Sequence, residues 1–222
     1  MKKFRVGIIG CGAIYHMHIG AISETENLEI SAICDIDKEK CEAEAKKYGS
    51  QAFTDYKEMI DKCALDAVHV LTPHYLHAEM SVYALCRGVN VLTEKPMAIT
   101  LADAKKMVSA ANESGAKLGV IFQNRYNTAS AAVKSELESG ALGKIIGARF
   151  NVFWFRDASY YQSGEWRGKW ATEGGGALIN QSIHTLDLTN WFISSEPECV
   201  SASMTNRSLR GIIEVEDEAS GL

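Results

Sequence analysis

Short apolar runs and longer helical patterns alternate along the first half of the chain. The apolar runs have the length and the β-branched content of buried strands, and they lie at about residues 4 to 9, 29 to 34, 66 to 71, 89 to 93 and 117 to 122. Strands that alternate with helices are typical of a parallel sheet covered by helices on both faces. We therefore predict an α/β fold whose first domain, residues 1 to 122, is a doubly wound parallel sheet.

The helical segment after residue 100 carries signals for both of its ends. Thr100 and Asp103 form a capping-box-like start, and Gly115 follows the last turn. Apolar residues at helical spacing predict a buried stripe. Its members are Leu101, Ala104, Met107, Val108 and Ala111.

The pattern changes after Phe122. A helix near residues 128 to 139 and a turn from Gly140 to Gly143 come first. A strand-like run from Ile145 to Phe155 follows, rich in aromatic and β-branched residues. We predict that a second domain begins here and covers residues 123 to 222.

Composition narrows the class of protein. With 222 residues, 46% of them hydrophobic, the chain can bury one full core and part of a second. The net charge of -5 and the pI near 5.7 give no basic footprint for nucleic acid. No apolar stretch has membrane-spanning length, and the amino terminus has the pattern of a globular strand where a signal peptide would lie. The six cysteines show no metal spacing and indicate reduced core thiols, so we expect a cytoplasmic protein without membrane or nucleic-acid partners.

A glycine turn follows the first predicted strand. Gly10 and Gly12 stand where the strand runs into a helix, with Ala13 and Ile14 next. Glycines at such a turn let a pyrophosphate approach backbone N–H groups, and the helix adds the positive end of its dipole. Alone this signal is weak, because Tyr15 stands where the dinucleotide fingerprint has a third small residue.

The second predicted strand ends at an acidic residue. Asp35 comes 25 residues after Gly10 and can accept hydrogen bonds from the hydroxyl groups of an adenosine ribose. Either Asp35 or Asp37 could instead merely cap the helix Lys38 to Tyr48. We assign the cap to Asp37 and the ribose to Asp35. We expect NAD as the cofactor, with NADP less favoured, because Ile36 offers a 2'-phosphate no counter-charge.

Lys95 follows the apolar run Val89 to Leu92. A lysine at the carboxyl end of a buried parallel strand lies where open α/β sheets bind ligands. Apolar surroundings lower a lysine pKa toward the range that is useful for proton transfer. The alternative is a surface lysine that ends a strand.

Another predicted strand, Val68 to Leu71, runs into Thr72 and Pro73, which we expect beside the same crevice. His74 and His77 follow in the loop and helix start. No acid or cysteine stands at metal-ligand spacing around them, so we predict no metal site and expect contacts to the cofactor or to the helix start.

Polar residues recur on one face of a later predicted helix, after three consecutive glycines. Asn180, His184 and Asp187 are spaced i, i+4 and i+7, which puts them on a common helical face. Such a stripe faces either water or a site. A histidine whose hydrogen bonds are satisfied within the fold is the alternative for His184.

Together these motifs resemble one known family, that of glucose-fructose oxidoreductase, inositol dehydrogenase and MocA (Gfo/Idh/MocA). The resemblance covers nearly the whole chain and runs through the segments GIIGCGAI, CDID, DAVHVLTPHYLHAEM, GVNVLTEKPMA, FQNRYN, GALGKI and GGGALINQSIHTLDL. Glu-Lys-Pro combined with Gly-Gly-Gly and the later histidine is its most specific part. It implies an NAD(P)-binding Rossmann domain followed by an α/β domain whose open, mostly antiparallel sheet supplies the substrate pocket.

The resemblance also implies roles for single residues. Lys95 matches the family's catalytic lysine and His184 its catalytic histidine, while Asn180 stands where inositol dehydrogenases have an aspartate. The implied reaction is hydride transfer between nicotinamide and a secondary hydroxyl of a sugar, sugar nucleotide or inositol-like polyol. Lys95 would hydrogen-bond the reacting oxygen, His184 would take the hydroxyl proton and Asn180 would fix the geometry. Glu94 and Lys95 are further candidates for contact with the cofactor.

Three residues are candidates for binding substrate hydroxyls or phosphates. They are Arg125, Tyr161 and Arg167. An arginine fork suits phosphate recognition. Ordinary surface or interface positions are the alternative for all three.

Two further hypotheses stay open. A redox-inert NAD-binding regulator needs the glycine turn and Asp35 but neither Lys95 nor His184. An inactive fragment is the other, because family members are typically longer and this chain stops at Leu222, in what should be a strand of the second sheet. An unfinished sheet exposes an edge and an apolar face, and we expect a homo-oligomer through that sheet where it is complete.

Overall fold

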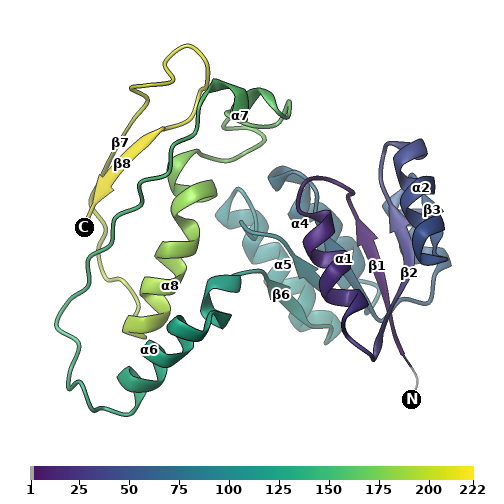
Figure 1. Cartoon of the computed structure of the whole chain (residues 1–222), viewed down its shortest axis with the longest axis horizontal. Helices are drawn as coiled ribbons and strands as arrows, with labels where there is room; N and C mark the ends of the chain where they lie inside the picture. Colours follow the sequence, from purple (N-terminus) through teal and green to yellow (C-terminus); the bar gives the residue numbers. More distant parts are fainter. Residues whose placement is uncertain (1–2) are drawn as a thin grey trace. The chain divides into compact units, whose positions relative to one another are not determined.

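The computed structural model describes residues 3–222 (Figure 1). The chain divides between Ile121 and Phe122 into two compact units, here called unit 1 and unit 2. Among the described residues, no helix is both long enough and apolar enough to cross a membrane.

Unit 1 is a six-stranded parallel sheet with the strand order β3-β2-β1-β4-β5-β6. Its strands are β1 (Phe4–Ile9), β2 (Leu28–Cys34), β3 (Gln51–Phe53), β4 (Ala67–Val70), β5 (Asn90–Thr93) and β6 (Leu118–Val120). This order runs outward in both directions from β1 and β4, which is the doubly wound Rossmann arrangement. The predicted fold class is confirmed, and the only strand that the apolar pattern missed in this sheet is β3.

Helices cover the sheet through two buried clusters. They are α1 (Tyr15–Ser23), α2 (Lys38–Tyr48), α3 (Tyr56–Lys62), α4 (His77–Leu85) and α5 (Leu101–Ser114), with the short 3-10 helix η1 (His74–Leu76) before α4. One cluster joins α1 and α2 to the sheet around Ile8 and Ile33. The other joins α3, α4 and α5 to it around Val68 and Val91. The core of unit 1 is therefore two layers of apolar contacts, one on each face of the sheet.

The predicted helix ends are confirmed. Asp37 accepts a hydrogen bond from the backbone N–H of Lys40 at 3.1 Å, and Thr100 accepts one from Asp103 at 3.1 Å. Gly115 ends α5 with a φ of 73°, in the left-handed region that glycine reaches without strain.

The predicted stripe of α5 is partly wrong. Met107 is fully buried, but Leu101 and Val108 are 72% and 48% exposed. With 3.6 residues per turn, these two side chains project roughly 65° to 90° from the centre of the stripe that Ala104, Met107 and Ala111 define. The helix therefore buries a narrower face than the apolar pattern indicated.

Unit 2 contains a two-stranded sheet and five helical segments. Its elements are η2 (Gln123–Tyr126), α6 (Thr128–Glu138), α7 (Ala158–Gln162), the π-helical η3 (Ala177–Ser182), α8 (Ile183–Ile193), β7 (Ala202–Thr205) and β8 (Glu218–Gly221). β7 and β8 pair antiparallel, and a small cluster around Tyr161 and Val215 forms a core.

The strand predicted from Ile145 to Phe155 is wrong. In the structure this segment has no regular hydrogen-bonded pattern, and Ile146 and Phe153 are almost wholly exposed. A strand forms only when it is hydrogen-bonded to a partner strand. Within residues 3–222 the second sheet consists of β7 and β8 alone, so the segment from Ile145 to Phe155 has no partner strand. The turn at Gly140 and Gly143 is present, and both glycines have positive φ.

Candidate functional site

The glycine turn is built against the end of β4. Gly10 has a φ of 102°, and a Cβ atom at this position would lie 2.9 Å from the carbonyl oxygen of Leu71. Glycine is therefore required at Gly10 both by conformation and by space. Gly12 is different, because its missing Cβ points into open space. An open face at Gly12 is what a pyrophosphate needs to approach the backbone.

Tyr15, which replaces the third small residue of the fingerprint, does not obstruct the turn. Its side chain is fully buried in the cluster that contains Ile33, Cys41 and Ala45. Burial raises the pKa of the Tyr15 hydroxyl well above its usual value. The ring fills the space between α1 and the sheet and leaves the outer surface of the turn clear.

Asp35 ties the glycine turn to the end of β2. Its carboxylate accepts a hydrogen bond from the backbone N–H of Cys11 at 2.6 Å and another from Asp37 at 2.9 Å. An ionised carboxylate has about four acceptor sites, so two backbone bonds leave capacity for ribose hydroxyls. The neighbouring Ile36 is 94% exposed. The predicted ribose ligand is thus held in place by the same backbone that forms the turn.

Three neighbouring strands end at the same level. Ile9, Val70 and Thr93 are in register across β1, β4 and β5, so the residues that follow them emerge side by side at the carboxyl edge of the sheet. Lys95 therefore comes from the same edge as Gly10. In a doubly wound sheet this edge, next to the β1/β4 switch point, is where ligands bind. The Lys95–Pro96 peptide is cis.

His77 fastens two loops of this edge. Its Nδ1 lies 2.7 Å from the carbonyl oxygen of Pro96, and its Nε2 lies 2.8 Å from that of Thr72. The side chain is fully enclosed, and burial lowers its pKa, although both carbonyls oppose this effect. In this structure His77 therefore holds the two loops together. Contact with the cofactor stays a prediction for His77 and equally for Thr72, Pro73 and His74, the last of which is 5% exposed.

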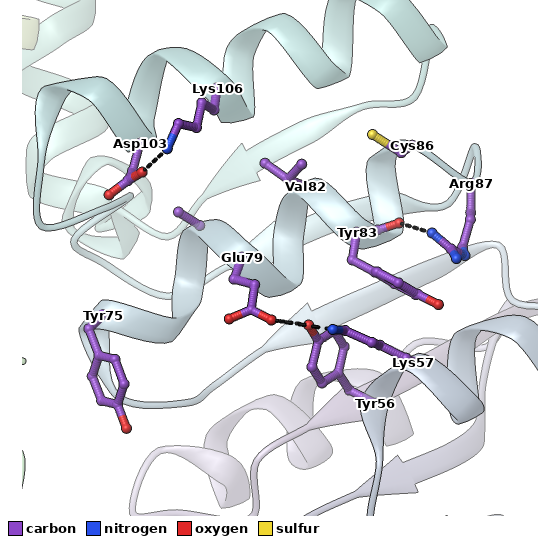
Figure 2. Close-up of a pocket in the computed structure, with 11 residues that line it drawn as sticks. Tyr56, Lys57, Tyr75, Glu79, Val82, Tyr83, Cys86, Arg87, Asp103 and Lys106 are labelled. Carbon is purple, nitrogen blue, oxygen red and sulfur yellow. Dashed lines mark hydrogen bonds and ion pairs between the residues drawn. The ribbon is translucent and has the colours of Figure 1, made fainter.

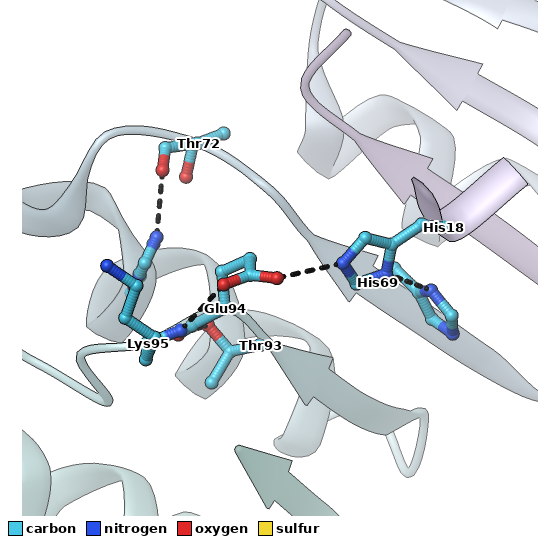
Figure 3. A network of polar contacts seen from close by, with 7 residues as sticks. His18, His69, Thr72, Thr93, Glu94 and Lys95 are labelled. Carbon is cyan, nitrogen blue, oxygen red and sulfur yellow. Dashed lines mark hydrogen bonds and ion pairs between the residues drawn. The ribbon is translucent and has the colours of Figure 1, made fainter. Parts of the chain in front are cut away.

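The sequence pattern singled out Glu94 but did not link it to His18 and His69, which form a row of polar side chains with it behind Lys95 (Figure 3). His18 of α1 places Nδ1 3.0 Å from Nδ1 of His69 in β4 and Nε2 3.0 Å from Oε1 of Glu94. Glu94 Oε2 accepts a hydrogen bond from the backbone N–H of Lys95 at 3.1 Å. No group of three His, Cys, Asp or Glu side chains suited to a metal ion is found within the described residues.

In unit 2, Asn180 is buried beside a carboxylate. Its Nδ2 donates to Glu173 Oε1 and, at 3.1 Å, to the hydroxyl of Tyr160. Glu173 is fully buried and also accepts a hydrogen bond from the backbone N–H of Gly168. The sequence pattern did not single out Glu173. Its only sequence signal is its place directly before the three glycines.

The start of the later helix is closed by a second buried carboxylate. Glu216 accepts hydrogen bonds from the backbone N–H groups of Gly176 at 3.0 Å and Leu178 at 2.9 Å. A Cβ at Gly176 would lie 2.0 Å from the carbonyl oxygen of Glu216, so only glycine fits. A negative side chain at a helix start also complements the helix dipole.

The predicted common face of Asn180, His184 and Asp187 rests on α-helical spacing, which the structure does not keep. Asn180 lies in the π-helical segment η3, and α8 begins only at Ile183. The wider π turn shifts the phase between them. Asn180 is buried in the polar cluster with Glu173, whereas His184 is half-buried with its ring edge-on to Phe122 at 6.3 Å between centroids.

The three predicted substrate ligands lie in unit 2 in different settings. Both carboxylate oxygens of Asp187 bind the guanidinium of Arg125, which raises the pKa of Arg125. The guanidinium group of Arg125 is therefore already hydrogen-bonded to Asp187 within unit 2. The ring of Tyr161 is 7% exposed, and burial raises its pKa to about 12. Arg167 stacks over Tyr160 at 4.3 Å, and its Nη1 donates a hydrogen bond to the Tyr160 hydroxyl.

A separate pocket of about 490 Å³ in unit 1 is lined by side chains of α3, α4 and α5 (Figure 2). Glu79 in this pocket accepts a hydrogen bond from Tyr56 at 2.8 Å and forms an ion pair with Lys57 at 3.5 Å. Asp103 pairs with Lys106 at 2.8 Å. Because these charges neutralise one another, we assign the pocket no part in the site.

Comparisons with known proteins identify the family to which the chain is similar. A family model described as an oxidoreductase family with an NAD-binding Rossmann fold (GFO_IDH_MocA) matches residues 4–122, and a model of the GFO/IDH/MocA C-terminal domain matches residues 130–222. Two curated relatives are glucose-6-phosphate 3-dehydrogenase of Bacillus subtilis and 1,5-anhydro-D-fructose reductase of Ensifer adhaerens. They are 31% and 33% identical over 92% and 90% of this chain, which spans 58% and 60% of their length.

A solved structure is also similar. The WlbA dehydrogenase from Bordetella pertussis, crystallised in complex with NADH and UDP-GlcNAcA, is 37% identical with a TM-score of 0.92. The match covers 98% of this chain and 66% of that one.

Proposed function

The chain belongs to the Gfo/Idh/MocA oxidoreductase family, whose first domain is an NAD-binding Rossmann fold, and on that premise we propose that it is an NAD-dependent dehydrogenase of sugar-like molecules. The reaction is hydride transfer between nicotinamide and the carbon of a secondary hydroxyl group. The observation that carries this proposal is the common level of the ends of β1, β4 and β5, which puts Gly10, Thr72 and Lys95 on one edge.

The residues of that edge fit the cofactor. Gly12 offers an open backbone face, α1 begins immediately after the turn, and Asp35 is fixed with acceptor capacity to spare. When bound, NAD supplies the hydride acceptor. The protein binds and orients it: the turn receives the pyrophosphate, and Asp35 receives the ribose hydroxyls.

The proton is handled by the protein's own side chains. We assign the ammonium of Lys95 to the reacting oxygen, where it stabilises the negative charge that develops as the hydroxyl proton leaves. His184 takes that proton on an imidazole nitrogen and returns it in the reverse direction. Glu173 and Tyr160 hold Asn180, so Asn180 contributes a fixed amide dipole and no charge.

For the substrate, we propose a nucleotide-activated sugar. The likeness to the WlbA dehydrogenase, whose complex holds UDP-GlcNAcA, supports this class. Arg167 supports it as well, since a guanidinium stacked on Tyr160 and Trp166, at 4.3 and 4.5 Å, is a stiff platform for phosphate or sugar oxygens. Oxidation at one secondary hydroxyl yields the keto-sugar nucleotide, NADH and one proton.

The test is turnover with the purified chain. It is incubated with NAD and a panel of UDP-sugars, free sugars, sugar phosphates and inositols, and NADH formation is followed. We expect NADH with UDP-sugars, loss of it in Lys95→Met and His184→Ala, and no change in His16→Ala, an exposed histidine of α1. Cofactor binding without turnover on any panel member would support the regulator hypothesis instead. Failure to bind NADH would contradict both.

The oligomeric state is part of the proposal. We propose a homo-oligomer formed through the sheet of unit 2 where that sheet is complete, and the molar mass in solution of a chain with the complete sheet tests it. A monomer at micromolar concentration contradicts this point alone.

A further inference from the structure

Three titratable side chains form an enclosed row behind the loop that carries Lys95. His18, 7% exposed, stands between His69 of β4 and Glu94 at the end of β5, with 3.0 Å separating the paired atoms on each side. Figure 3 shows the three side chains aligned toward the Lys95 backbone. None of the three side chains is a candidate for contact with the reacting oxygen, so a role of the row in catalysis has to act through another residue.

The protonation of the row follows from its chemistry. Burial alone would raise the pKa of Glu94, but the hydrogen bonds from His18 and from the Lys95 backbone N–H contribute to a pKa that is lowered overall. Burial and His18 lower the pKa of His69 to about 4, so His69 is neutral. A carboxylate only accepts, so the Nε2 of His18 carries a proton. When His18 is neutral with its proton on Nε2, its Nδ1 is an acceptor, and the 3.0 Å contact then needs Nδ1–H on His69 as the donor.

Each side chain of the row therefore constrains the next one, from His69 to the Lys95 backbone. His69 fixes the tautomer of His18, His18 fixes the position and charge of Glu94, and Glu94 accepts the Lys95 backbone N–H at 3.1 Å. A partner that sets the tautomer of a histidine also sets what its other nitrogen can do. The charged or titratable groups that face this row are His77 and Lys95, both of which interact electrostatically with Glu94 or its neighbours.

We propose that His18 is a positioning residue that, with its tautomer set by His69, holds Glu94 so that the Lys95 backbone is fixed at the edge of the sheet. This role deepens the proposed function, and its catalytic part rests on that function. The structural part does not, because it concerns the Lys95 backbone in the protein without substrate.

The first experiment is solution NMR of the substrate-free protein. In His18→Leu, which removes the donor at similar volume, the Lys95 amide resonance should move. In His18→Gln, whose amide can still donate to Glu94, it should stay close to wild type. His16→Ala, an exposed histidine on the same helix, is the matched control and should leave it unchanged. The nitrogen shifts of the wild-type rings should show Nε2–H on His18 and Nδ1–H on His69.

The second experiment is kinetic. His18→Leu should lower kcat by up to about 10²-fold, the cost of a small misplacement of a catalytic group, with NADH affinity nearly unchanged. The loss of His18 removes support for the charged form of Glu94, so the acid limb of the kcat profile should move to higher pH. His18→Gln should recover most of the activity. A purely structural loss of packing would lower activity equally in both variants and would not move the pH profile.

The results separate the two proposals. A Lys95 amide that does not move in a folded His18→Leu variant overturns the positioning role, whatever the activity, and so does Nδ1–H on His18. A wild type that shows the expected ring tautomers and the expected amide shift but no turnover supports the positioning role and contradicts the proposed function. Equal kcat in His18→Leu and wild type overturns the catalytic part of this inference.

Discussion

Asn180→Asp should make the stability of unit 2 depend on pH. In the wild type, the Asn180 amide donates to the fully buried Glu173 carboxylate. The substitution keeps the shape of the side chain but replaces that donor by a second carboxyl group. At neutral pH, two carboxylates cannot both be ionised there without strong repulsion, so the pair must hold a proton.

The size of the repulsion follows from the distance between the two carboxylates, which would lie at hydrogen-bonding separation. Two unit charges about 3 Å apart at an effective dielectric near 20 repel by roughly 5 kcal/mol, which is about 4 pKa units. The repulsion therefore raises the pKa of the introduced carboxyl group in the folded protein well above the value of about 3.9 that it has in the unfolded chain. Because the folded-state pKa is the higher one, the variant keeps its stability below about pH 4. It loses about 1.4 kcal/mol per pH unit as the pH rises from there toward the folded-state pKa.

The assay is urea unfolding followed by tryptophan fluorescence. All four tryptophans lie between residues 154 and 191, so the signal reports unit 2. The free energy of unfolding of Asn180→Asp relative to wild type should fall by about 3 kcal/mol between pH 5 and pH 7. Asn190→Asp, at an exposed position of α8, is the matched control and should show almost no slope. A difference between Asn180→Asp and wild type that is the same at both pH values would refute the reasoning.

Three further outcomes are expected. Lys95→Met should abolish turnover, while its NADH affinity, measured by titration, stays within about tenfold of the wild type. His184→Ala should lower turnover by roughly 10²- to 10⁴-fold. Near wild-type activity in either variant would contradict the role assigned to that residue. Binding of NAD(H) should be tighter than that of NADP(H), because a 2'-phosphate close to Asp35 costs roughly 1 to 4 kcal/mol, and Asp35→Ser should narrow the gap in the same titrations. Gly10→Ala should lower the free energy of unfolding by about 1 to 3 kcal/mol, since its φ of 102° and the nearby carbonyl oxygen of Leu71 both oppose a side chain; an unchanged denaturation midpoint would argue against that geometry.

The main features of unit 1 could be predicted because they are local in sequence. Five of its six strands are apolar runs of ordinary length, and helix caps such as Asp37 and Thr100 act over three residues. β3 could not be predicted, because three residues are too few to show a period and it pairs only with β2. The run from Ile145 to Phe155 failed for the opposite reason. Its residues favour strands, but strand formation is decided by a partner and not by the segment itself.

The candidate site was predictable only in part, for the same physical reason. Gly10 and Lys95 stand next to strand ends, where the sequence pattern is clear. The partners of His18 are 51 and 76 residues away, and only the register of the sheet brings them together. Glu173 lies seven residues before Asn180, but it stands in a turn before η3 begins, so no helical spacing links the two in the sequence.

The carboxylate of Glu216 at the helix start has a consequence for the order in which the chain folds as it is made. Every strand pair of the large sheet closes before Phe122, so that sheet can assemble as soon as β6 has left the ribosome. The Gly176 turn, in contrast, is bonded to a residue 40 positions further along. At about 5 to 20 residues per second, the start of η3 waits roughly 2 to 8 seconds for its anchor. During that time α8 can already be held by residues made earlier, because Asp187 pairs with Arg125 and the Trp191 carbonyl accepts from Lys134.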